Sequence, residues 1–101
     1  MPPDPKPAKR ILDRYASSRK LKADQACRFC RHSATDGHHI LLRSQSGDDV
    51  EDNILPLCHT CHMSYHAGSL ASLDLSDAER LYVQVKLGVG ADSYLERRGY
   101  S

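Results

Sequence analysis

The stretch GHHILLRSQSGDDVEDNILPLCHTCHMSYH, residues 37–66, holds five of the six histidines and two of the four cysteines of this sequence. It opens with the adjacent pair His38 and His39, and its last ten residues contain two cysteines and three histidines. These last residues serve one metal site, two metal sites, or a metal site and a catalyst. The answer separates an enzyme from a module that zinc only stabilises.

Apolar residues and turn formers divide this stretch into four elements. We expect a strand over 37–43, a polar loop over 44–53 with a turn at Gly47, a strand over 54–57 and a helix over 58–67. Pro56 marks the second strand as an edge or bulged strand, because proline cannot donate a ladder hydrogen bond. Gly68 is typical of a helix end. The pattern predicts two short strands followed by a helix.

The four cysteines form two Cys-x-x-Cys pairs, Cys27/Cys30 and Cys58/Cys61. Each pair places two thiolates on one turn, and four thiolates complete a tetrahedral zinc shell. Because that shell is closed, we expect a structural zinc. The four cysteines could instead form two disulfides, but that arrangement is more typical of a secreted chain. Two separate redox pairs are the other alternative, but no thioredoxin-like βαβ pattern accompanies them.

With the cysteines paired, the histidines are available for a second site. His38 and His39 are neighbours on a strand, so their side chains point to opposite sides. His62 and His66 are four positions apart on a helix and share one face, which suits two ligands of one metal. One strand histidine can join them, and the other then stands beside the metal without binding it.

These residues resemble the HNH nuclease motif of the ββα-metal superfamily. The order is a histidine pair on the first strand, an asparagine in the loop and a helix that carries the last histidine. The spacings are similar to those of the colicin-type DNases, and the flanking Cys-x-x-Cys pairs resemble the zinc-bearing branch. The resemblance covers residues 27–66. It implies a small α+β fold, in which a ββα-metal core with a four-cysteine zinc site is flanked by N- and C-terminal helices.

The resemblance also implies roles for individual residues. His39 matches the general base, and Asn53 matches the loop residue that makes His39 point correctly. His38, His62 and His66 match the ligands of a catalytic metal; many family members have Asp at the position of His38. The implied function is a metal-dependent DNA endonuclease that hydrolyses phosphodiester bonds.

The ligand types bear on the choice of metal. Three imidazoles favour Mn²⁺, Co²⁺, Ni²⁺ or Zn²⁺, whereas Mg²⁺ prefers oxygen ligands. The resemblance still allows Mg²⁺, because the substrate phosphate contributes oxygens. We interpret His32 and His59 as solvated or supporting residues. The acidic run, which contains Asp48, Asp49, Glu51 and Asp52, is expected to be a solvated loop tip.

Charge is unevenly distributed along the 101 residues, whose net charge is +1. Residues 1–43 hold ten Lys/Arg and four Asp/Glu, residues 44–79 hold seven Asp/Glu and no Lys/Arg, and residues 80–101 hold four Lys/Arg and two Asp/Glu. Without the histidines, a solvated surface with uneven charge would be the preferred explanation of this distribution. With the histidines, the distribution favours a DNA partner contacted mainly through its backbone.

Helical periodicity continues on both sides of the core. Residues 1–7 contain four prolines and are expected to be a disordered lead-in. Residues 8–26 form a basic segment with a helix over about 8–21, whose charged face comprises Lys9, Arg10, Arg14, Arg19 and Lys20. After the core, at 27–68, residues 69–101 are expected to form a C-terminal helix and a tail. A capping box of Ser76 and Glu79 begins that helix, Ala78, Leu81, Tyr82 and Val85 recur at helical spacing, and Gly88 ends it.

No segment has the apolar length of a membrane span or a signal peptide, so we expect an intracellular, cytoplasmic protein without a membrane partner. By resemblance, freestanding HNH proteins of this size are encoded by phages beside packaging genes, which implies a partner such as a terminase. Two alternatives to the nuclease remain. One is a zinc-stabilised nucleic-acid-binding module without catalysis, and the other is a structural zinc module that acts as a protein adaptor.

Overall fold

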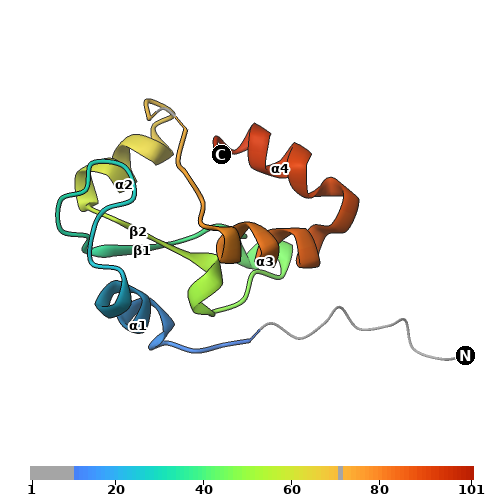
Figure 1. Ribbon diagram of the computed structural model, residues 1–101, viewed down its shortest axis with the longest axis horizontal. Coiled ribbons are helices and arrows are strands. Elements are labelled where there is room, and N and C mark those ends of the chain that lie inside the picture. The colour runs from blue at the N-terminus through green and yellow to red at the C-terminus, as the bar shows by residue number, and fades with distance from the viewer. Residues whose placement is uncertain (1–10, 71) are drawn as a thin grey trace, which may run out of the picture.

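The computed structural model describes residues 11–70 and 72–101 as a small α+β fold (Figure 1). Its elements are α1 (Ala16–Ala23), β1 (Asp36–His39), β2 (Ile54–Leu57), α2 (His59–His66), α3 (Asp77–Leu87) and α4 (Ala91–Arg97), with short 3-10 turns at Arg43–Gln45, Glu51–Asn53 and Gly88–Gly90. This agrees with the predicted fold class. None of the helices in the described ranges has the length and apolar character needed to cross a membrane.

The two strands form one antiparallel sheet that places the histidine pair. His38 lies opposite Leu55 and His39 lies opposite Ile54. The first strand ends at His39, earlier than the predicted residue 43. The reason is Asn53, whose backbone oxygen accepts the N–H of Ile40 at 2.9 Å and whose Oδ1 accepts the N–H of Leu41 at 2.8 Å. These bonds replace the strand ladder and turn the chain into the loop.

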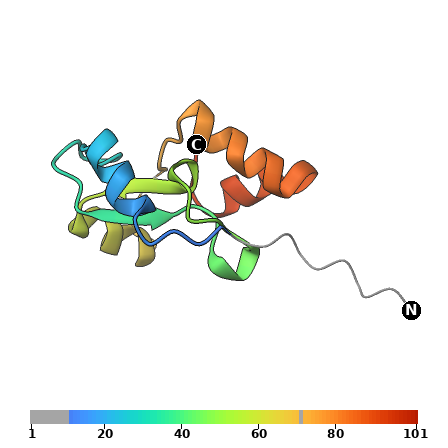
Figure 2. The same cartoon turned by 90° about the horizontal axis from the view of Figure 1, so that it is seen from below.

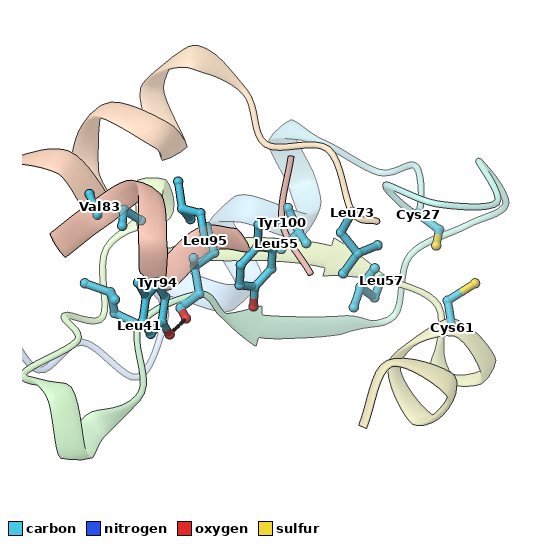
Figure 3. Packing of buried hydrophobic residues seen from close by; sticks show 12 residues of the cluster. Cys27, Leu41, Leu55, Leu57, Cys61, Leu73, Val83, Tyr94, Leu95 and Tyr100 are labelled. Carbon is cyan, nitrogen blue, oxygen red and sulfur yellow. Dashed lines mark hydrogen bonds between the residues drawn. The ribbon is translucent and has the colours of Figure 1, made fainter. Parts of the chain in front are cut away.

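Helices cover the sheet on two sides. Figures 1 and 2 together show α1 on one side and α2 on the other, with α3 and α4 beyond one end of the sheet. The buried cluster joins residues from the sheet, the loop and the C-terminal segment; it includes Leu41, Leu55, Leu57, Leu73, Val83, Tyr94, Leu95 and Tyr100 (Figure 3). The segment after Gly88 is therefore part of the core, whereas its order was left open by the sequence.

The N-terminal helix is shorter than predicted. It begins after Tyr15, and the predicted residues 8–10 lie outside the described ranges. Residues 11–15 are not helical because their backbone N–H groups are taken by distant carboxylates: Ile11 donates to Asp48 at 2.7 Å and Asp13 donates to Asp49 at 3.0 Å. Ala16 is fully buried.

Two members of the basic face expected on this helix, Arg19 and Lys20, are neutralised within the chain, and Lys9 and Arg10 lie outside the described residues. Arg19 pairs with Asp13 at 2.6 Å and with Glu51 at 3.0 Å, and Lys20 pairs with the buried Glu79 at 2.8 Å. These two side chains stabilise the fold, so they are poor candidates for phosphate contacts.

The C-terminal helix α3 begins as predicted, with a complete capping box between Ser76 and Glu79. Its buried side is not the apolar one, because Leu81 and Val85 are 59% and 76% exposed while Glu79 and Val83 are fully buried. Glu79 turns inward because Arg28 Nη1 donates to its Oε1 at 2.5 Å and Lys20 donates to its Oε2. An ion-pair network therefore determines which face of α3 is buried.

Candidate active site and metal centres

The four cysteine sulfurs gather in one cluster, with every Sγ within 4.8 Å of the others. Cys27 and Cys30 lie on a tight turn in which Arg31 N–H bonds to the Cys27 carbonyl at 2.9 Å. Cys58 is the N-cap of α2, and its sulfur accepts the N–H of Cys61 at 3.4 Å. One shared cluster contradicts the alternative of two separate redox pairs.

The cluster fits a tetrahedral zinc. Zinc–sulfur bonds of about 2.3 Å place ligating sulfurs roughly 3.8 Å apart, and Cys30 Sγ lies 3.6 Å from Cys58 Sγ. Burial opposes ionisation of Cys27, but backbone N–H groups of Cys30, Cys58 and Phe29 lower its pKa to about 6. Burial and the neighbouring thiols raise the pKa of Cys61. A divalent cation would allow all four thiols to ionise, because it offsets the repulsion among four adjacent thiolates.

A second cluster brings three histidine rings together from β1 and α2. His38 Nδ1 lies 3.3 Å from His62 Nε2, and His66 Nε2 lies 3.0 Å from the same nitrogen. Metal–nitrogen bonds of about 2.1 Å in a tetrahedral site imply nitrogens roughly 3.4 Å apart. The three predicted ligands therefore lie at the separation that a shared metal requires, which includes His66 from the last turn of the helix.

Two neighbours determine which nitrogens of this His38/His62/His66 cluster can bind a metal. The Asp36 carboxylate can only accept, so His62 donates Nδ1–H to it at 2.9 Å and keeps a lone pair on Nε2. The other nitrogen of His38, Nε2, lies 2.7 Å from the Tyr100 hydroxyl, which leaves Nδ1 to face the cluster. His62 Nε2 therefore presents a lone pair toward ring nitrogens of His38 and His66, and neutral imidazoles can bind a metal through such nitrogens. The donor set thus fits a metal.

The electrostatics of His38 agree with this arrangement. Burial, with added repulsion from the His62 and His66 rings, lowers the pKa of His38 to about 3. His38 is only 4% exposed, so it remains neutral at physiological pH with its lone pair available. The hydrogen bond from His62 holds the pKa of Asp36 down at about 2, so this carboxylate stays ionised and keeps its acceptor role.

His39 points away from the histidine cluster, as strand alternation predicts. Its Nε2 lies 2.9 Å from Asp49 Oδ1, and its side chain is 26% exposed. Because the carboxylate accepts, the hydrogen sits on Nε2 and Nδ1 carries the lone pair. His39 is therefore partly open to solvent, fixed in orientation and able to accept a proton.

Asn53 fixes the loop that carries this carboxylate. It is fully buried, and its Nδ2 donates to the carbonyls of Leu41 at 3.2 Å and Asp48 at 2.9 Å. The loop is closed over Gly47, where a Cβ would press against the Leu41 carbonyl oxygen. Asn53 thus contacts the loop next to Asp49, and Asp49 contacts His39, which is the geometry that the predicted role of Asn53 requires.

The expectation of a solvated acidic loop tip is wrong for two residues. Asp48 and Asp49 are 3% and 9% exposed because the segment before α1 covers them and donates backbone N–H groups to both. Lys86 also pairs with Asp48 at 2.6 Å. The other two acids differ, since Asp52 is exposed and Glu51 pairs with Arg19.

Three site residues were missed by sequence reasoning. Asp36 carried a usable signal, because it lies two positions before His38 and shares its face of the strand. Asp49 and Tyr100 carried none, since a loop closure and a contact across 62 positions bring them to the histidines. Of the two histidines set aside, His59 bonds to Asp36 at 3.2 Å from a position where its side chain is 73% exposed, and His32 is exposed.

Comparison with known proteins points to the same segment. Residues 25–68 match the family model described as HNH endonuclease. The chain is also similar to Anaredoxin from Nostoc sp. (strain PCC 7120 / SAG 25.82 / UTEX 2576), with 38% identity over 39 residues. That match covers 39% of this chain and 51% of Anaredoxin, so the chain spans about half the length of that relative. The segment 25–68 thus matches the model of an HNH endonuclease domain, and its cysteine cluster is consistent with the zinc-bearing branch of that family.

Proposed function

We propose that this protein is a metal-dependent DNA endonuclease that hydrolyses phosphodiester bonds. The observation that carries the proposal is that two adjacent histidines lie in different environments, one suited to bind a metal and the other suited to act as a base. His38 joins His62 and His66 in a cluster of metal-binding geometry, while His39 stands apart, partly exposed and held by Asp49. One general base and one adjacent metal ion suffice for phosphodiester hydrolysis.

The chain supplies three functions in this reaction. His39 Nδ1 takes the proton from the attacking water, and Asp49 holds the imidazole while it becomes charged. Asn53 keeps the loop closed so that Asp49 stays in place. The His38/His62/His66 cluster would hold the cation, with Mn²⁺, Co²⁺, Ni²⁺ or Zn²⁺ favoured by its three imidazoles and Mg²⁺ allowed by oxygens from the substrate. When bound, that cation offsets negative charge on the phosphate and on the departing oxygen.

A plasmid-nicking assay with added Mn²⁺ tests the proposal. Loss of a positioned general base costs roughly 10²–10⁴-fold in rate, so His39→Ala should lose cleavage by at least that lower factor. His32→Ala is the matched control, because His32 is exposed and lies outside both clusters. Zinc content and the circular dichroism spectrum should be unchanged in both variants.

Two outcomes would contradict the proposal. Near-normal cutting by a folded His39→Ala protein would remove His39 as the base. Wild-type protein that binds DNA yet cuts none with any of the five metals would instead support the nucleic-acid-binding module without catalysis.

A further inference from the structure

A cavity of about 390 Å³ opens directly beside the histidine cluster. It is lined by Tyr65, His66, Gly68, Leu70, Arg97, Arg98 and Gly99. His66 is thus shared between the histidine cluster and the cavity wall. The opposite wall comes from the end of α4, which lies outside the segment that matches the HNH family.

Arg98 is fixed at this wall by its backbone and by an aromatic ring. Its N–H donates to the Tyr94 carbonyl at 3.0 Å, and its own carbonyl accepts the Tyr65 hydroxyl at 2.8 Å. The guanidinium carbon lies 5.9 Å from the centroid of the Tyr94 ring. Residues of α2 and α4 therefore hold Arg98 in the wall of the cavity that His66 also lines.

The guanidinium of Arg98 has an unused donor. Its Nε is buried and has no hydrogen-bond partner among the described residues 11–70 and 72–101. Buried donors are normally satisfied by protein, water or a ligand, so this donor remains available to an acceptor that the described residues do not supply.

The cavity favours an anion. Arg97 lines it as well, and its exposed side chain donates to the Ser93 carbonyl at 3.3 Å. Among the described residues, the lining contains two arginines, one histidine and no carboxylate. The neighbouring acid Glu96 lines a different cavity, together with Asp92. Arginine is suited to phosphate because its planar fork donates two parallel hydrogen bonds.

We propose that this cavity is a phosphate-binding site for the DNA strand, in which Arg98 binds the phosphate beside the histidine cluster and Arg97 binds a neighbouring phosphate. Its choice of ligand rests on the proposed nuclease function. The site extends the HNH domain, because both arginines come from the C-terminal segment.

Binding of a labelled duplex oligonucleotide without added divalent metal, across a salt series, tests this site separately from catalysis. Arg98→Lys keeps the charge and the aliphatic stem but loses the fork, so affinity should fall by roughly ten-fold or more with the salt slope unchanged. Arg97→Gln removes one phosphate contact, so the salt slope should decrease by about one unit. Lys22→Gln is the charge-matched control, since Lys22 is exposed on α1 across the sheet.

Zinc content, melting temperature and Mn²⁺ affinity should match the wild type in all three variants, which separates loss of phosphate binding from loss of fold. Normal affinity and an unchanged slope in both arginine variants would overturn the proposal. So would inorganic phosphate binding that depends on Arg98 while oligonucleotide binding does not, because the cavity would then be a free-phosphate site. Wild-type protein that binds the duplex through Arg98 but cuts nothing would refute the nuclease and leave this site standing.

Discussion

A single carboxylate, Asp36, accepts hydrogen bonds from the Nδ1 atoms of both His59 and His62. The bond to His62 determines that its other nitrogen faces His38 and His66. Partners of this kind orient metal ligands and raise their basicity. The metal affinity of the histidine cluster should therefore depend on a residue that does not belong to it.

We predict that Asp36→Asn weakens Mn²⁺ binding by roughly 10–100-fold, because an amide can donate to His62 Nδ1 and so release the preferred tautomer. Isothermal titration with Mn²⁺ on zinc-loaded protein measures the change. His59→Ala is the matched control, since it removes only the exposed partner of Asp36. Equal Mn²⁺ affinity in Asp36→Asn and wild type would show that the tautomer of His62 is fixed by another group.

For individual residues, the sequence predicted correctly how side chains of the same strand or helix are oriented relative to one another. The opposite directions of His38 and His39 follow from strand geometry, and the shared face of His62 and His66 follows from helix geometry. Asp49, Arg98 and Tyr100 could not be predicted, because only the folded chain brings them to the histidines. Local periodicity carries no information about such contacts.

Among the elements, α3 is attached to α1 and to the zinc turn through one buried acid. Glu79 is fully buried and accepts from Arg28, Lys20 and the N–H of Ser76. Burial raises the pKa of Glu79, but the hydrogen bonds from Arg28, Lys20 and Ser76 lower it more, so the net shift is downward from 4.5. Arg28 follows Cys27 directly, so this network also links α3 to the zinc turn.

We predict that Glu79→Gln lowers the free energy of unfolding at pH 7 by roughly 3–5 kcal/mol, the usual cost of removing one partner from a buried ion pair. Since the pKa of Glu79 is lower in the folded state than in the unfolded state, its contribution is complete above the ordinary value and is lost as pH falls through the folded-state value. The stability difference between wild type and variant should therefore shrink below about pH 4.5. Denaturant unfolding from pH 7 to pH 3 measures it.

The comparison between wild type and variant removes the separate effect of acid on the cysteine cluster, which both proteins share. Asp77→Asn serves as the control, because Asp77 lies in the same helical turn but is exposed. A wild type and a Glu79→Gln variant of equal stability at pH 7 would show that the network contributes nothing net.

Element boundaries were predicted where capping chemistry fixes them and missed where distant groups intervene. The capping box gave the start of α3, and Gly88, with φ of 59°, gave its end. The start of α1 was wrong because Asp48 and Asp49 take the backbone N–H groups of residues 11 and 13. The predicted buried face of α3 was wrong, since Leu81 and Val85 are exposed whereas Val83 and the ion-paired Glu79 are buried.

Over the whole molecule, the eight-residue helix α2 supplies residues to both candidate metal centres. A shell of four thiolates is closed, whereas three imidazoles leave a position open, and open sites exchange metal faster. We predict that graded EDTA abolishes DNA cleavage before it unfolds the protein, and that Mn²⁺ or Ni²⁺ restores cleavage better than Ca²⁺. Cleavage, circular dichroism and released zinc should be followed in the same samples.

Elemental analysis should find about one tightly held zinc per chain, and Cys58→Ser should unfold or loosen the domain because metal binding supplies folding energy in a small core. Simultaneous loss of cleavage, structure and zinc at every EDTA dose would refute two independent metal centres. A fully folded Cys58→Ser protein would refute the structural role of zinc.

The packing of Tyr94, Arg98 and Tyr100 against residues of the HNH segment has a consequence for protein synthesis. These three are translated some thirty positions after that segment ends, so the nascent chain carries the histidines before it carries the side chains that fix and complete their site. We expect ribosome-bound chains that stop before Tyr94 to be poor at binding metal and DNA even when zinc has already folded the cysteine cluster. The order of translation would then keep the histidine cluster incomplete until the C-terminal residues have packed against it.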